Sequence, residues 1–153
     1  MRLYTVGYEK RSLEDLLKTL LENGIDLLVD IRAVPHSRKK DFTKKNLEKS
    51  LSENGIEYSL IKELGSPKEL RDKVRSDGDY EYFFGEYEKS LKNKKEYLSA
   101  LLNLIKTRTA CLFCYEADAD RCHRKSVAGK LGEQNDIDAI LTDSTLIVDE
   151  TVG

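Results

Sequence analysis

The stretch 25-IDLLVDI-31 decides the fold of this chain. Apart from its two aspartates it is apolar, and it is short enough for a strand but too short for a buried helix. Asn23 and Gly24 stand just before it, and this pair is typical of the end of a helix. A strand that is covered on both faces of a parallel sheet has this continuous apolar pattern. We therefore predict a buried parallel strand at 25–31.

Strand patterns and helix patterns alternate on both sides of this stretch. Further strands are expected at LYTV (3–6), IEYSLI (56–61), TACLFCY (109–115), DAIL (138–141) and TLIV (145–148). Helices are expected after an N-cap at Ser12 and over the ranges 43–54, 80–91, 98–105 and 122–134. Strands that are separated by helices favour a parallel sheet with helical crossovers. The sequence therefore predicts a Rossmann-like three-layer α/β/α sandwich in which residues 1–153 form one domain.

The composition narrows the class of protein. The chain has 153 residues and a net charge of -2, so no overall basic charge marks it as a nucleic-acid or membrane binder. No apolar run approaches the roughly 20 residues of a membrane span, and the start MRLYTVGYEK lacks the apolar core of a signal peptide. These features predict a cytoplasmic protein that does not associate with membranes. An odd count of cysteines, three in all, then favours reduced thiols over a disulfide framework.

Polar residues of unusual type follow three of the expected strands. They are Tyr8 after the first strand, Asp30, Arg32, Ser37 and Arg38 after the second, and Cys114, Glu116, Cys122, His123 and Arg124 after the strand at 109–115. The carboxyl ends of parallel strands share one edge of the sheet, where open α/β sheets bind ligands. We therefore expect these residues to meet at one site. Asp30 ends an apolar strand and needs a partner there, for which Arg32 and Arg124 are the candidates.

Four blocks of the sequence contain these residues and resemble a known family. They are TVGYEKRS (5–12), LVDIRAVPHSR (28–38), GIEYSLIKELG (55–65) and CYEADADRCHR (114–124). Together they resemble the family known as domain of unknown function 488, in order and over nearly the whole chain. The resemblance implies an α/β fold and a pocket that these blocks share, but no defined activity. Ser66 departs from the pattern, which has a second glycine after Leu-Gly, and this leaves the conformation of that turn open.

An anion or nucleotide pocket is the function that these residue types favour. Arg32, Arg38, His123 and Arg124 would donate to the anion, and arginine suits bidentate binding of phosphate or carboxylate. Asp30 and Glu116 would orient the donors or accept hydrogen bonds from a base or sugar, and Tyr8 would stack. A helix that begins near Cys122 would add its N-terminal dipole. The alternative is an internal ion-pair network that joins the loops and binds nothing.

An enzyme acting on a phosphate-bearing or nucleobase-containing substrate is the first functional hypothesis. Asp30, Glu116 and His123 would then transfer protons, and Cys114 or Cys122 would serve as a nucleophile. The Cys-x5-Arg loop of cysteine phosphatases is not present around Cys122. A zinc site is a weaker alternative, because Cys111 and Cys114 would point to opposite faces of one strand. We therefore expect neither a metal nor a cofactor.

A binding module without catalysis is the second hypothesis. The basic stretch 38–45 could contact a nucleic-acid backbone, and the aromatic stretch 80–87 could bind bases or a protein. Helical spacing explains most of the aromatic residues as core, with Tyr82 outside the apolar stripe. The expected ligand is a small anion or nucleotide, with nucleic acid as an alternative partner. The sequence does not determine the oligomeric state.

Overall fold

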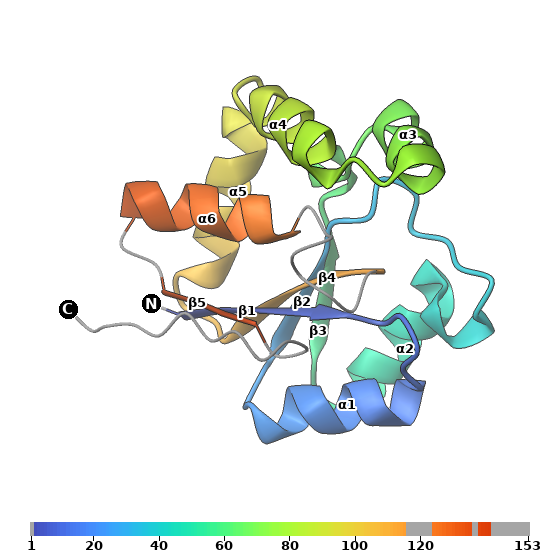
Figure 1. Cartoon of the computed structure of the whole chain (residues 1–153). Coiled ribbons are helices and arrows are strands. Elements are labelled where there is room, and N and C mark those ends of the chain that lie inside the picture. The colour runs from blue at the N-terminus through green and yellow to red at the C-terminus, as the bar shows by residue number, and fades with distance from the viewer. Residues whose placement is uncertain (1, 116–123, 136–137, 142–153) are drawn as a thin grey trace.

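A parallel sheet forms the centre of the structure, a computed structural model that describes residues 2–115, 124–135 and 138–141. Within these residues the sheet has five strands in the order β3-β2-β4-β1-β5, and every pairing is parallel (Figure 1). The strands are β1 (Arg2–Gly7), β2 (Leu27–Asp30), β3 (Glu57–Leu60), β4 (Ala110–Cys114) and β5 (Asp138–Leu141). The prediction at 145–148 lies outside the described residues.

Strand β2 confirms the prediction from which the fold was inferred. Each residue of Leu27–Asp30 is fully buried, and β2 lies between β3 and β4. Its side chains alternate between the two faces of the sheet, with Leu28 in one core cluster and Leu27 and Val29 in the other. Burial on both faces explains why this segment lacks the apolar–polar alternation of a half-exposed strand.

Six helices are present in the described part of the chain. They are α1 (Leu13–Glu22), α2 (Lys44–Glu53), α3 (Lys68–Asp77), α4 (Tyr80–Leu91), α5 (Lys95–Ile105) and α6 (Arg124–Asn135). Short 3-10 turns occupy Lys40–Phe42 and Lys62–Leu64. The expected cap of the first helix is present, because the Ser12 side chain accepts a hydrogen bond from the Asp15 amide at 3.0 Å.

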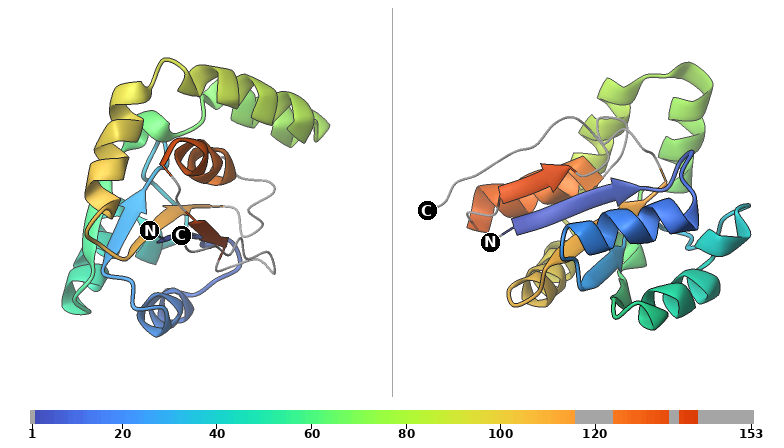
Figure 2. Two further views of the ribbon diagram at one scale, coloured as in Figure 1. Left: turned by 90° about the vertical axis from the view of Figure 1, so that its left-hand side faces the viewer. Right: turned by 90° about the horizontal axis from the view of Figure 1, so that it is seen from below.

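The helices cover the two faces of the sheet in separate layers (Figure 2). Helices α1 and α2 pack on one face through Leu16, Leu20, Leu47 and Leu51, which join Leu28, Cys111 and Phe113 in one core cluster. Helices α4, α5 and α6 cover the other face, where Tyr87, Leu98, Leu101, Val127 and Leu131 pack on Leu3, Val29 and Leu112. The structure therefore confirms the α/β/α sandwich with a parallel sheet. None of the helices within the described ranges is long and apolar enough to cross a bilayer.

Helix α3 has no counterpart among the elements expected from the sequence. None of its residues is buried, and the core contact of its partly buried Leu70 is too little to form the apolar stripe that would reveal a helix. Ion pairs between Lys68 and Asp72 (2.8 Å) and between Lys73 and Asp77 (2.5 Å) join successive turns instead. Gly78 ends the helix in the left-handed conformation with φ 69°. Local charge pairing and a glycine cap therefore define this helix, and a search for apolar periodicity overlooks it.

The turn at Leu64–Pro67 packs tightly against the segment that follows β2. A Cβ on Gly65 would lie 2.2 Å from the Ala33 amide nitrogen, so this position has no room for a side chain. Ser66, the departure from the family pattern, is buried, and its carbonyl accepts from Arg71 Nη1 at 2.9 Å. The backbone at Gly65 is extended, with φ -71° and ψ 159°. Of the two neighbours, Gly65 is the one whose place in the turn requires glycine.

Candidate functional site

The connections that leave the carboxyl edge of the sheet change face at the end of β4. Strand β4 lies between β1 and β2. The chain leaves β1 and β2 toward α1 and α2 on one face, whereas α6, the helix after β4, lies on the opposite face. Helices on opposite faces diverge beside the strand ends, and this is where open parallel sheets bind ligands. The described members of the three groups of polar residues predicted to converge therefore lie near this end of β4, some on each face of the sheet.

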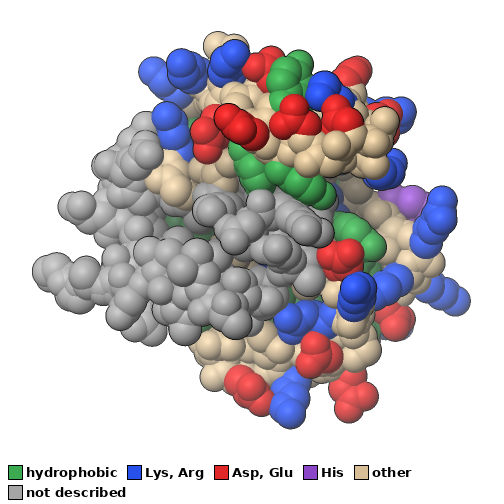
Figure 3. Space-filling view, viewed as in Figure 1, with side chains coloured by type: hydrophobic (Ala, Val, Ile, Leu, Met, Phe, Trp, Pro, Cys, Tyr) green, Lys and Arg blue, Asp and Glu red, His purple; other side chains and the backbone are tan. Residues whose placement is uncertain are grey.

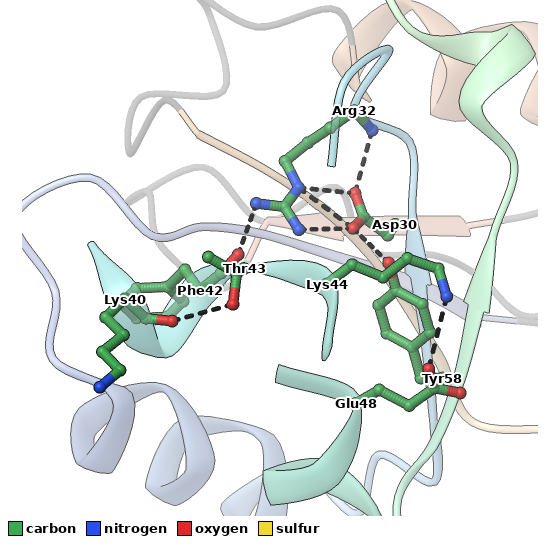
Figure 4. Close-up of polar contacts among 8 residues, drawn as sticks. All are labelled: Asp30, Arg32, Lys40, Phe42, Thr43, Lys44, Glu48 and Tyr58. Atoms are coloured by element: carbon green, nitrogen blue, oxygen red, sulfur yellow. Dashed lines mark hydrogen bonds and ion pairs between the residues drawn. The ribbon is translucent and has the colours of Figure 1, made fainter. Parts of the chain in front are cut away.

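A buried ion pair lies at the carboxyl end of β2, on the side of α2 (Figure 4). Asp30 is fully buried and Arg32 is 6% exposed. Arg32 donates from Nε to Asp30 Oδ1 (2.9 Å), from Nη2 to Oδ2 (2.7 Å), and from its backbone amide to Oδ1 (3.0 Å). Of the two partners considered for Asp30, Arg32 is the one that binds it. Two parallel bonds between a guanidinium and a carboxylate fix both groups in orientation as well as distance.

Two further residues complete this network. The Tyr58 hydroxyl on β3 donates to Asp30 Oδ2 at 2.6 Å. Arg32 Nη1 donates to the carbonyl of Phe42 at 2.8 Å, which ties the loop after β2 to the strand end. Asp30 thus accepts from two residues, and each nitrogen of the Arg32 guanidinium has a protein acceptor. The name carboxyl-edge network is used below for Asp30, Arg32, Phe42 and Tyr58.

Burial and charge fix the protonation states of this network. Burial by itself would lower the pKa of Arg32, but the hydrogen bonds and charge of Asp30 outweigh it and raise this pKa above its ordinary value. Burial, and then the negative charge of Asp30, raise the pKa of Tyr58 well above its ordinary value. At neutral pH Arg32 is therefore a cation and Tyr58 a neutral hydrogen-bond donor.

Aromatic rings surround the Arg32 guanidinium. The Tyr8 ring stacks on Phe42 and Phe113, with centroids 4.6 and 5.2 Å apart. The guanidinium carbon of Arg32 lies 5.4 Å from the Tyr8 centroid and 5.0 Å from that of Phe113. Cation–π attraction therefore adds to the ion pair. Tyr8 is thus a neighbour of Arg32, as the sequence predicted for residues that follow different strands.

Cys114 and Arg124 lie together at the end of β4, on the side of α6. Arg124 is fully buried at the first position of α6, and its Nη1 lies 3.4 Å from Cys114 Sγ. The Tyr8 amide donates to the Cys114 carbonyl at 3.1 Å, so this pair adjoins the aromatic rings through the backbone. Arg32 and Arg124 therefore lie at neighbouring strand ends but approach them from opposite faces of the sheet.

The loop after β2 carries the remaining predicted residues that the structure describes. Ser37 Oγ accepts from the Lys39 amide at 3.0 Å, and Arg38 is exposed. Lys39, which the sequence analysis did not single out as a site residue, donates from Nζ to the carbonyls of Tyr8 (3.3 Å) and Arg11 (3.1 Å). The loop is thereby held beside Tyr8 at the carboxyl edge of the sheet.

The described cysteines differ in state and in position. Cys111 is a free, buried thiol in the core beneath α1 and α2. Cys114 is disulfide-bonded, so the prediction of reduced thiols is wrong at this position. The number of cysteines in a chain indicates the redox environment of the protein. It does not indicate whether two particular cysteines lie close enough to form a disulfide. Among the described residues no three His, Cys, Asp or Glu side chains are grouped so that they could hold a metal ion.

The structure thus brings Tyr8, Asp30, Arg32, Cys114 and Arg124 to one edge, with Ser37 and Arg38 on an adjoining loop. Glu116, Cys122 and His123 lie outside the described residues. Tyr58 and Phe42 were missed because their types suggest core packing. The signal for Tyr58 was its place on a strand that is parallel to β2, two residues before Leu60, the register partner of Asp30, from where its long side chain reaches the carboxylate.

Comparison with protein families identifies the chain. The sequence model of the family described as "Domain of unknown function DUF488" matches residues 12–131. The chain therefore belongs to this family, as its sequence blocks predicted. No curated protein and no solved structure matches the chain.

Proposed function

We propose that this member of the DUF488 family binds a small phosphate-bearing anion, such as a nucleotide, in a crevice at the carboxyl edge of the sheet, at the end of β4. The observation that carries the proposal is the position of Arg124. Its side chain is fully buried at the start of α6, a helix of 12 residues, and lies beside the end of β4. A helix N-terminus offers backbone N–H groups and a positive dipole end to an anion, and Arg124 adds a full charge there.

The carboxyl-edge network serves as the scaffold of the site. Arg32 already donates from Nε, Nη1 and Nη2 to protein acceptors. The charge of Arg32 is balanced by Asp30, so Arg32 supports the Tyr8 ring and does not present a free fork to the ligand. Asp30 likewise orients Arg32 and Tyr58, which makes it a positioning residue. Direct contact with the anion is therefore assigned to the α6 N-terminus, with the charge of Arg124 beside it.

Aromatic and basic groups beside the crevice favour a nucleotide over a bare anion. Tyr115 is 47% exposed, and its ring meets the edge of Tyr8 at 5.2 Å, so a flat aromatic surface is open to a base. Exposed Arg38 and Lys40 flank Lys39 on the loop that is tied to Tyr8. They add positive potential that would attract a phosphate. Glu116, Cys122 and His123 follow Tyr115 in sequence and remain the hypothetical acid–base and nucleophilic groups of an enzyme.

The test is calorimetric titration with inorganic phosphate, AMP and UMP. We expect saturable binding at or below about 1 mM that weakens with salt. Arg124→Lys should weaken it about tenfold, because lysine cannot make the bidentate contact. Arg108→Lys is the matched control, since Arg108 lies at the opposite edge of the sheet, and it should leave binding unchanged.

A second variant keeps the test informative if Arg124→Lys does not fold. Tyr115→Ala changes an exposed side chain and should weaken nucleotides but not inorganic phosphate. Absence of binding at millimolar concentration in the wild type, or equal affinities in the Arg124 and Arg108 variants, would refute the proposal. Tighter binding of an oligonucleotide than of mononucleotides would instead favour the nucleic-acid module. Turnover of a nucleotide would favour the enzyme.

A further inference from the structure

We propose that a second site, a groove between α4, α5 and α6, binds a small amphiphilic anion that carries a carboxylate or sulfonate on a short apolar body. The groove has a volume of about 510 Å³. It is lined by Leu91, Lys92, Lys95, Leu98, Ser99, Leu102, Lys130 and Leu131. None of these residues belongs to the carboxyl-edge network, so this site and the crevice can be tested independently.

The floor of the groove is apolar. Leu91, Leu98 and Leu131 come from three different helices and belong to the core beneath them, and Leu102 is partly exposed beside them. Figures 1 and 2 show α4, α5 and α6 side by side over the same face of the sheet. The floor is therefore a junction of three packed helices. Its volume falls in the range of small-molecule sites, roughly 300–1,000 Å³.

The rim of the groove is basic. Lys92 follows α4, Lys95 lies in the first turn of α5, and Lys130 is on α6, so each of three segments contributes one ammonium group. No lining residue is acidic. Figure 3 shows Lys and Arg side chains gathered over the α4 and α5 region at the upper left. The groove therefore combines a positive rim with an apolar floor.

These lysines differ from other lysines of the same face in their pairing. Lys89 on α4 binds Glu86 at 2.9 Å, and Lys94, just before α5, donates to the Glu63 carbonyl at 2.5 Å. Within the described part of the chain, Lys92, Lys95 and Lys130 make no ion pair. Their charges are thus available to a ligand.

Charge and size together define the ligand. Three ammonium groups attract an anionic head group, and their point charges do not demand the planar fork that arginine would. The leucine floor favours an apolar body next to that head group. A groove of this volume suits a small molecule. A fatty carboxylate is the simplest molecule with these properties.

The test is an NMR titration of the whole chain with octanoate, with 1-octanol as the neutral analogue of equal length. We expect saturable octanoate shifts at the amides of Leu98, Ser99 and Leu131, with affinity about tenfold above that for octanol. Lys95→Met with Lys130→Met should weaken octanoate about tenfold and bring it close to octanol.

The matched control is Lys45→Met with Lys49→Met, which removes two exposed charges from α2 and should leave octanoate binding unchanged. Phosphate binding at the crevice should be unaffected by either pair of changes. A failure of the groove proposal can therefore be told apart from a failure of the crevice proposal. Three results would each overturn the proposal. They are octanol binding as tightly as octanoate, equal effects of the two pairs of lysine changes, and shifts located away from the groove.

Discussion

Strand β2 has an arginine–carboxylate cluster at each end, and the two clusters differ in burial. At the amino end Arg108 binds Asp26 Oδ1 at 3.4 Å and also bonds the carboxylate of Glu57. At the carboxyl end Arg32 binds Asp30. The side chains of Arg108 and Asp26 are 30% and 49% exposed, whereas those of Arg32 and Asp30 are 6% and 0% exposed. The same pairing of residue types thus occurs once in partial contact with solvent and once in the core.

From this difference we expect burial to decide how much unfolding free energy is lost when one residue of such a pair is removed. The number of contacts should matter less. Water and salt screen an exposed ion pair, and its net stabilisation is small. A buried pair adds little net stability over apolar residues, but removing one partner strands a charge in the interior. We therefore regard the Asp26–Arg108 cluster as a surface clamp between strands. The Asp30–Arg32 pair is a fixed scaffold, and removing either residue should destabilise the fold strongly.

The largest expected effect comes from Asp30→Asn. It leaves the Arg32 cation buried without its counter-charge, and we expect unfolding free energy to fall by about 3–5 kcal/mol. Urea unfolding at neutral pH measures this loss. Replacing both partners, as in Asp30→Leu with Arg32→Met, should recover a substantial part of it. A loss below about 1 kcal/mol in the single variant would mean that the two ends of β2 do not differ as described.

Tyr58→Phe should have the next largest effect. It removes one hydrogen bond to a charged acceptor, while the remaining donors to Asp30 stay, so we expect a loss of about 1.5 kcal/mol. Tyr82→Phe is the matched control, because Tyr82 is 44% exposed on α4 and should show no change. Equal stabilities of the two variants would show that the Tyr58 hydroxyl adds nothing to the scaffold.

Alkaline pH should lower the unfolding free energy of the protein because of the protonation of Tyr58. The pKa of Tyr58 is raised in the folded protein, so above about pH 10 the unfolded chain loses a proton that the folded one keeps. The unfolded state then binds fewer protons, and stability falls with pH by at most about 1.4 kcal/mol per unit for each such tyrosine. Burial raises the pKa of Tyr87 as well and adds to the slope. Urea unfolding between about pH 9 and pH 11 should give a shallower slope for Tyr58→Phe, and parallel slopes would contradict this.

Arg108→Ala should have the smallest effect. The Arg108 ion pairs are partly exposed, so we expect a loss of only about 0.2–1 kcal/mol. Salt at about 1 M should reduce this loss further, whereas the effect of Asp30→Asn should persist, because buried charges are screened little. A salt-independent loss comparable to that of Asp30→Asn would remove the distinction between the two clusters.

Much of the fold could be predicted from the sequence because apolar patterns record burial. The run at 25–31 marked β2, and Ser12 marked the start of α1. Convergence of Tyr8, Arg32 and Arg124 on one edge followed from strand direction alone. These inferences depend on the spacing of apolar residues and on the order of strands and helices along the chain. Both can be read from the sequence.

The rest could not be predicted because it depends on distances between side chains. Helix α3 is held by surface charges and leaves no apolar stripe. The choice of Arg32 over Arg124 as the partner of Asp30, and the hydrogen bond from the Tyr58 hydroxyl to the same carboxylate, depend on side-chain geometry at the strand ends. The placement of Arg32 and Arg124 on opposite faces depends on which way the chain leaves each strand.

The most direct test of the account is to map AMP binding by NMR on both ends of β2. Saturable shifts are predicted for the amides of Tyr8, Cys114 and Arg124 at the carboxyl edge, and none for Asp26, Arg108 and Thr109 at the amino edge. Shifts centred on the amino edge, or no saturable shift at millimolar AMP, would contradict the assignment of the ligand site to the end of β4.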